Sequence, residues 1–165
     1  MAILLALALF LAADAAPVKL NAGDDAPAFA LTASNGKTVR LADYKGKKKV
    51  VLAFFPKAFS GGCAKEMAAF RDQQAAFDAQ DTQILAISLD DLDTQKKFAE
   101  SLKLTFPVLS DKGGRAATAY GVKGAMWAAR TNFVIDESGK IIAIFAGKEA
   151  IDPGLPLSVT KRKAS

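Results

Sequence analysis

The apolar run at residues 50–55 is the feature that most limits what this chain can fold into. An unbroken run of apolar residues rich in β-formers, ended by Pro56, is typical of a strand that is covered on both faces of a sheet. A short Ser/Gly loop follows and leads into residues 64–80, whose apolar side chains recur at helical spacing. The sequence therefore predicts a strand–loop–helix unit of an α/β protein.

The only cysteine of the chain, Cys63, stands where this loop meets the helix. Unpaired backbone N–H groups and the helix dipole favour thiolate over thiol at such a place, and the thiolate is the nucleophilic form. A free cysteine is also among the most often buried residues and can act as a small hydrophobic side chain. Spacing alone leaves the reactive and the inert interpretation equally open.

The segment around Cys63 resembles the peroxidatic segment of peroxiredoxins, whose signature is Pro-x-x-x-Thr/Ser-x-x-Cys. Pro56, Ser60 and Cys63 occupy its fixed positions. Four further segments resemble the family in the same order along the chain: the entry strand at 23–31, the central segment at 98–111, a helix end at 119–122 and the arginine-bearing strand at 130–136. Within the family, the chain is most similar to the bacterioferritin-comigratory, or Q-type, branch.

The resemblance implies roles for five residues. Cys63 would attack the peroxide, Ser60 would donate to it or orient it, and Arg130 would polarise it and favour the thiolate. Pro56 would shield the thiolate from water, and Glu66 would hold Arg130. Plainer roles are compatible with the same residues: Ser60 could cap the helix and Pro56 could only end the strand. Arg130 and Glu66 could be solvated surface charges.

Two departures from the family pattern bear on the mechanism. Gly61 and Gly62 precede Cys63 where the family often has Pro-Gly, which predicts a more flexible loop. Ala68 stands five residues after Cys63, where this branch often carries a resolving cysteine. A sulfenic acid on Cys63 would then be reduced by an external thiol, from a thioredoxin-like or glutaredoxin-like protein or a low-molecular-weight thiol. The resemblance thus implies a one-cysteine peroxiredoxin that reduces hydrogen peroxide or organic hydroperoxides.

A protein of another class fits the same fold, namely a non-enzymatic thioredoxin-fold module that senses oxidation or binds a partner. Ser60 and Arg130 favour the enzyme, because binding alone needs neither. Dithiol exchange within the chain is excluded, since the positions three residues from Cys63 hold Ser60 and Glu66. The chain has no histidine, which excludes His-based metal sites and Cys–His or Ser–His–Asp catalysis, and we expect no metal and no other cofactor.

The remaining patterns predict one thioredoxin-like α/β domain, with a central mixed sheet flanked by helices and an added N-terminal β-hairpin. The expected elements are a hairpin of 28–33 and 38–41 around Asn35-Gly36, a strand at 83–89, a helix at 94–102 capped by Asp93 or Thr94, a helix within 111–120 ended by Gly121, and a hairpin of 131–135 and 141–145. After Gly147 the pattern predicts a short or frayed terminus.

Residues 1–15 differ in composition from the rest of the chain. Residues 3–13 are an apolar stretch too short to span a bilayer, and Ala13 and Ala15 are small residues of the kind that a signal peptidase reads. The pattern predicts a secretory signal cleaved near Ala15, hence an exported domain of residues 16–165 without stable membrane insertion. The segment has no Lys or Arg, so a misassigned start or a core helix is the alternative. A single thiol in an exported protein favours a functional cysteine.

The charge of the chain does not indicate a particular function. The net charge is +5, and the visible basic clusters, at 45–49 and 161–163, have no aromatic ladder or nucleic-acid motif beside them. We interpret both clusters as solvated, the second as a short basic tail, and expect no nucleic-acid partner. The resemblance is compatible with a monomer or a weak homodimer.

Overall fold

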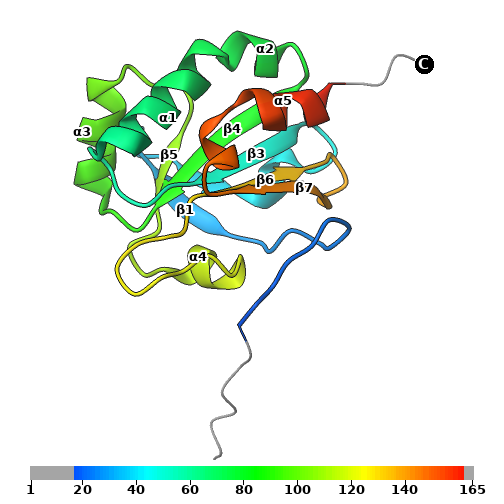
Figure 1. The fold of residues 1–165 in the computed structure, drawn as a ribbon, viewed down its shortest axis with the longest axis horizontal. Coiled ribbons are helices and arrows are strands. Elements are labelled where there is room, and N and C mark those ends of the chain that lie inside the picture. The colour runs from blue at the N-terminus through cyan, green and yellow to red at the C-terminus, as the bar shows by residue number, and fades with distance from the viewer. Residues whose placement is uncertain (1–16, 162–165) are drawn as a thin grey trace, which may run out of the picture.

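A computed structural model describes residues 17–161 of the chain, and within them seven strands form one mixed sheet in the order β2-β1-β5-β4-β3-β6-β7 (Figure 1). The strands are β1 (Ala30–Ala33), β2 (Thr38–Arg40), β3 (Lys49–Phe54), β4 (Thr82–Ser88), β5 (Val108–Ser110), β6 (Thr131–Ile135) and β7 (Ile141–Ala146). Strands β3, β4 and β5 run parallel, whereas the other neighbouring pairs run antiparallel. The predicted thioredoxin-like mixed sheet with an N-terminal hairpin is thereby confirmed.

Strand β3 lies between two hydrophobic cores, because successive side chains of a strand point to opposite faces. Val50, Leu52 and Phe54 pack in one core, and the alternate residues 51, 53 and 55 pack in the other. The helices are α1 (Gly61–Asp72), α2 (Gln74–Asp78), α3 (Leu92–Ser101), α4 (Arg115–Ala119) and α5 (Gly154–Thr160), with short 3-10 helices η1 (Leu41–Tyr44) and η2 (Glu149–Ile151). Figure 1 shows α1, α2, α3 and α5 on one side of the sheet and α4 on the other.

The helix expected at 64–80 is two helices, and the first begins earlier than predicted. Helix α1 starts at Gly61, so that Cys63 lies inside its first turn, and it ends before Gln73. A continuous helix would separate Phe70 from Phe77 by about 10 Å along its axis. The break brings the two rings to 5.9 Å, where both are buried in the same core. Tertiary packing therefore overrides the local helical pattern.

The short or frayed terminus expected after Gly147 is wrong, because η2 and α5 follow there. Ala150 in η2 and Thr160 in α5 are fully buried, and Asn132 Nδ2 of β6 donates to the carbonyl of Ala150 at 2.8 Å. Proline and glycine had suggested an irregular end, but Pro153 and Gly154 stand at the start of α5, where they interrupt no helical hydrogen bond. The segment closes the core over β6 and β7.

Two smaller expectations also need correction. Helix α3 is capped by Asp91, whose carboxylate accepts from the N–H of Thr94 at 2.8 Å, and not by Asp93 or Thr94. Strand β5, only 3 residues long, was missed. The turn after α4 does follow the prediction, because Gly121 has a φ of 70°, the left-handed conformation that ends many helices.

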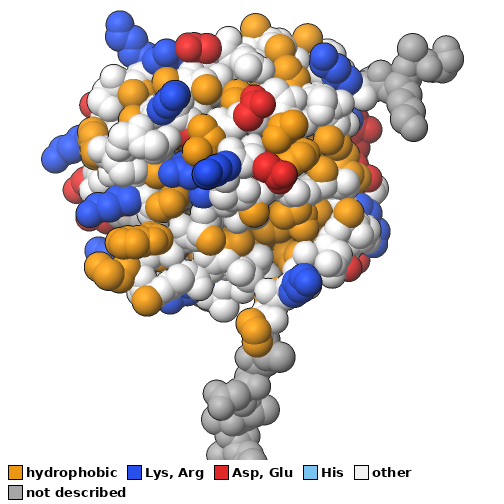
Figure 2. Space-filling model, in the orientation of Figure 1, with side chains coloured by type: hydrophobic (Ala, Val, Ile, Leu, Met, Phe, Trp, Pro, Cys, Tyr) orange, Lys and Arg blue, Asp and Glu red, His pale blue; other side chains and the backbone are white. Residues whose placement is uncertain are grey.

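Charged side chains are dispersed over one face of the protein (Figure 2). Figure 2 shows Lys and Arg side chains scattered among acidic and apolar ones on the face seen there. No helix of residues 17–161 is long and apolar enough to cross a membrane. The expected signal segment, residues 1–15, lies outside the described residues, as do residues 162 and 163 of the expected basic tail.

Candidate active site

Sheet register brings Cys63 and Arg130 together. Strand β3 ends at Phe54, and a short loop leads from it into α1, in whose first turn Cys63 lies. Strand β6 runs antiparallel to β3 and places Thr131 opposite Phe54, so Arg130 lies at the same end of the sheet. Nη2 of Arg130 donates to Sγ of Cys63 at 3.3 Å. The cysteine is fully buried, so the arginine is a cation held against a sulfur away from bulk water.

Glu66 lies one turn along α1 from Cys63 and holds the same arginine. Its Oε2 accepts from Nη1 of Arg130 in an ion pair, while the other guanidinium nitrogen faces the sulfur. The carboxyl of Glu66 is fully buried and the side chain of Arg130 is 15% exposed. The prediction that Glu66 and Arg130 could be solvated charges is therefore wrong, and the contact expected between them is present.

The electrostatics of this pair follow from burial. Burial raises the pKa of Glu66 to about 7 from 4.5, against the opposing effect of Arg130. One carboxyl oxygen, Oε1, has no hydrogen-bond partner among the described residues, which accounts for the dominance of desolvation. Burial lowers the pKa of Arg130, but Glu66 and Cys63 together outweigh it and raise that pKa above its ordinary value. The guanidinium is thus a permanent cation between two acidic groups.

Gly62 has a role that the sequence interpretation missed. A Cβ atom at this position would lie 3.3 Å from Nη2 of Arg130, tighter than most real contacts of such atoms. The missing side chain lets the arginine approach the first turn of α1 closely. The sequence predicts a flexible loop from Gly61 and Gly62, and the close approach of Arg130 is a further reason for a glycine at position 62.

Ser60 and Pro56 lie on the loop that leads to the cysteine. Ser60 holds the N-cap position of α1, but its hydroxyl makes no capping bond and donates to the carbonyl of Lys57 at 3.0 Å. The side-chain cap considered for Ser60 is therefore absent. Pro56 is half-buried and lines a small cavity together with Asp90 and Trp127. The roles of Ser60 and Pro56 toward a peroxide stay predictions.

Asp90 is a further residue that the sequence interpretation missed. Its Oδ2 accepts from the N–H of Ala58 at 2.8 Å and from the hydroxyl of Ser88 at 2.5 Å. It follows β4, which lies parallel to β3 and ends beside it. Polar residues after neighbouring parallel strands meet at one edge of the sheet, so Ser88 and Asp90 were the signal that could have indicated this contact.

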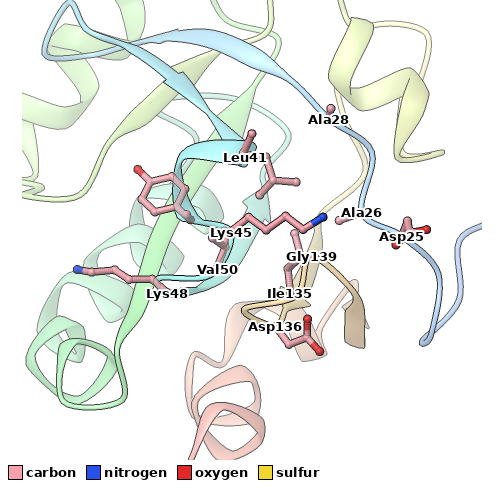
Figure 3. A pocket seen from close by; sticks show the side chains of 12 residues that line it. Asp25, Ala26, Ala28, Leu41, Lys45, Lys48, Val50, Ile135, Asp136 and Gly139 are labelled. Atoms are coloured by element: carbon pink, nitrogen blue, oxygen red, sulfur yellow. The ribbon is translucent and has the colours of Figure 1, made fainter.

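One apolar-lined cavity of the protein lies away from the cysteine. This cavity, of about 230 Å³, lies at the end of β3 opposite to the loop that carries Cys63. Figure 3 shows its lining, which includes Lys45, Val50 and Ile135. Within residues 17–161, no group of three potential ligands is placed to hold a metal ion. The arrangement at Cys63 is that of a buried nucleophile with a fixed cation.

The thioredoxin-like fold and the Cys–Arg–Glu arrangement define a thiol enzyme of the class suggested by the sequence. A family model described as the AhpC/TSA family matches residues 22–144. The chain belongs to this family, the peroxiredoxins, which are thiol-dependent peroxidases.

The relatives support the same assignment. Alkyl hydroperoxide reductase E of Mycobacterium bovis is 43% identical over 126 residues, 74% of this chain and 82% of the relative. Peroxiredoxin Q of the chloroplast of Populus jackii is 35% identical over 130 residues, 77% of this chain and 61% of the relative. The solved structure of peroxidoxin BcpB from Mycobacterium tuberculosis has a TM-score of 0.82 at 32% identity, covering 86% of this chain and 97% of that one. The resemblance to the Q-type branch is confirmed.

Proposed function

We propose that Cys63 is the peroxidatic cysteine of a one-cysteine peroxiredoxin that reduces hydrogen peroxide or organic hydroperoxides. The thiolate attacks one peroxide oxygen, the O–O bond breaks, and the other oxygen leaves as hydroxide or alkoxide and takes up a proton. The sulfur is oxidised to sulfenic acid and the peroxide is reduced to water or an alcohol. Arg130 stabilises the charge on sulfur and on the leaving oxygen, while Glu66 fixes the guanidinium beforehand.

The observation that carries this proposal is the hydrogen bond of 3.3 Å from Arg130 Nη2 to Cys63 Sγ, with the guanidinium also bound by Glu66. An inert buried cysteine needs no cation at its sulfur, and a buried arginine is costly unless it is paired. Ser60 and Pro56, on the loop before the helix, would complete the site by orienting the peroxide and excluding water.

The second half of the cycle needs a thiol from outside, because the chain has a single cysteine. A reductant thiol attacks the sulfenic sulfur, water leaves, and a mixed disulfide forms on Cys63. A second thiol then releases Cys63 and leaves with the first as a disulfide. We propose a thioredoxin-like or glutaredoxin-like protein or a small thiol as this reductant.

Stoichiometry tests the proposed cycle. Peroxide added to the reduced chain without thiol should give one equivalent of sulfenic acid on Cys63 and then stop, followed by sulfinic acid in excess oxidant. Intact mass spectrometry measures both products, with Cys63→Ser as the control that should stay unmodified. Added thiol should restore turnover. Sustained turnover without any thiol, or a sulfur that does not react, would contradict the proposal.

We also propose that residues 1–15 direct export and that residues 16–165 act as one domain, a monomer or a weak homodimer. The apolar stretch of residues 3–13 and the lone thiol support export. The mass of the protein recovered after expression in a bacterial host, compared between cell fractions, tests cleavage near Ala15. A full-length protein retained inside the cell would refute it, and sedimentation at two concentrations measures the oligomeric state.

A further inference from the structure

The sulfur of Cys63 is closed off from any external thiol. Cys63 is fully buried in a hydrophobic cluster that also contains Phe55, Ala58 and Met67. A reductant sulfur has to approach to about 2 Å to form a mixed disulfide. The proposed reduction of Cys63 by another molecule therefore requires the loop before α1, or the first turn of α1, to move away first.

Asp90 ties this loop to the body of the protein. Its Oδ2 accepts from the N–H of Ala58 in the loop and from the hydroxyl of Ser88 at the end of β4. Ser88 is itself held, because its Oγ accepts from Nε2 of the fully buried Gln95 at 2.8 Å. The carbonyl of Asp90 accepts from the hydroxyl of Ser110 at 2.7 Å. Asp90 is thus held to the end of β4 through its carboxylate and to β5 through its carbonyl, and Ser88 connects the carboxylate to α3.

The loop beyond this contact is the part that covers the cysteine. Ala58 is 4% exposed and packs in the cluster of Cys63. The next residue, Phe59, has a φ of 64°, which is costly for a bulky side chain, and its ring lies against Phe98 of α3 at 5.3 Å. Among residues 17–161, the backbone of Ala58 makes one hydrogen bond, and its acceptor is the carboxylate of Asp90.

We propose that Asp90, through its hydrogen bonds to Ala58 and Ser88, is a positioning residue that sets how often the loop opens to let an external thiol reach Cys63. This inference rests on the proposed one-cysteine cycle and names the residue that governs its reductive half. In the closed loop Cys63 lies beside Arg130 and reacts with peroxide. In the open loop the oxidised sulfur meets the reductant, and Asp90 sets the balance between the two states.

The test measures access to Cys63 with a reagent that is bulkier than peroxide. In the full chain, the Cys63 thiolate attacks the aromatic disulfide dithiobis-nitrobenzoate, forms a mixed disulfide with one half of it and releases the other half as a coloured thiolate. Asp90→Ala should raise the rate of this reaction about tenfold or more, because hydrogen bonds to a carboxylate are lost. The rate with hydrogen peroxide should not rise, since it depends on the closed state. A sulfur that was simply more exposed would react faster with both.

Asp91→Ala is the matched control. The neighbouring carboxylate of Asp91 caps α3 by accepting from the N–H of Thr94, so its loss weakens the start of that helix and should leave access to Cys63 unchanged. Asp90→Asn keeps an oxygen that can accept from Ala58, and its rate should lie between those of the natural chain and Asp90→Ala. Equal access in Asp90→Ala and in the natural chain, or in Asp90→Ala and Asp91→Ala, would overturn the proposal.

A measurement on the natural chain decides the matter even where Asp90→Ala fails to fold. The Ala58 amide should exchange its hydrogen, and Cys63 should react with the disulfide reagent, through the same opening of the loop. The protection factors obtained from the two measurements should therefore be equal. Labelling of Cys63 much faster than opening at Ala58 would refute the role of Asp90. A chain that does not react with peroxide would refute the proposed function alone, because these two measurements use no peroxide.

Discussion

The buried carboxyl of Glu66 should make the protein less stable as the pH rises, and Glu66→Gln should remove this dependence. The pKa of Glu66 is raised by burial from 4.5 to about 7. The folded state therefore holds a proton that the unfolded chain has already lost between these two values. The contribution of Glu66 to the free energy of unfolding is therefore at its full value below about pH 4.5, and it is lost as the pH rises through about 7.

The size of the effect follows from the shift. A difference of about 2.5 units at about 1.4 kcal/mol per unit corresponds to about 3 kcal/mol of unfolding free energy. Most of it should disappear between pH 4.5 and pH 8. Glutamine has nearly the same shape, still accepts from Arg130 and does not titrate, so its free energy of unfolding should lack this term.

Urea unfolding of both chains at pH 4.5 and pH 8 measures the effect. A Cys63→Ser background in both chains removes oxidation of the thiol. The pKa values of Asp25, Asp91 and Asp136 are lowered in the folded protein, and these groups contribute equally to both chains and cancel in the difference. From pH 4.5 to pH 8, the free energy of unfolding should fall by about 3 kcal/mol more in the chain with Glu66 than in the Glu66→Gln chain. Profiles that run parallel within about 0.5 kcal/mol would show that burial does not govern Glu66.

Three further substitutions test the site and the core. Arg130→Met keeps the bulk but removes the cation, and the peroxide rate measured by stopped flow should fall about a hundredfold or more; a change within about twofold would disprove its role. Ala68→Cys should yield an intrachain disulfide with Cys63 after peroxide, seen as a loss of two hydrogens by mass, if the start of α1 unwinds; sulfenic acid alone would show that it does not. Tyr120→Phe should cost about 1–2 kcal/mol in urea unfolding, because the buried hydroxyl donates to the carbonyl of Pro27 at 2.8 Å, and an unchanged stability would contradict this.

The parts of the fold that the sequence predicted are those with a strong local period. The apolar run at 50–55 became β3, and Asn35-Gly36 became the turn of a hairpin in which Gly36 has a φ of 81°. The triad of Cys63, Glu66 and Arg130 was predicted through the family resemblance. No periodicity connects position 66 with position 130, since their contact depends on the register between β3 and β6.

The parts that were missed depend on contacts distant in sequence. Helix α5 forms at the end of the chain because its apolar side chains cover the core beside β6 and β7, and this benefit is invisible in a segment read alone. The hydrogen bond between Asp90 and Ala58 spans 32 positions. Local propensity describes what a segment can form, and packing decides whether it does.

The burial of Cys63 serves one half of the catalytic cycle and opposes the other. A sulfur shielded from water keeps the full effect of the neighbouring guanidinium, since charges interact more strongly where solvent is excluded. The same shielding keeps a reductant thiol out. A chain with a second cysteine nearby could resolve the sulfenic acid from within, but Ala68 offers no thiol. The loop before α1 therefore has to be closed when Cys63 reacts with peroxide and open when a thiol reduces it. Hydrogen bonds from the loop to one side chain, Asp90, can hold the closed state and still break often enough for the loop to open.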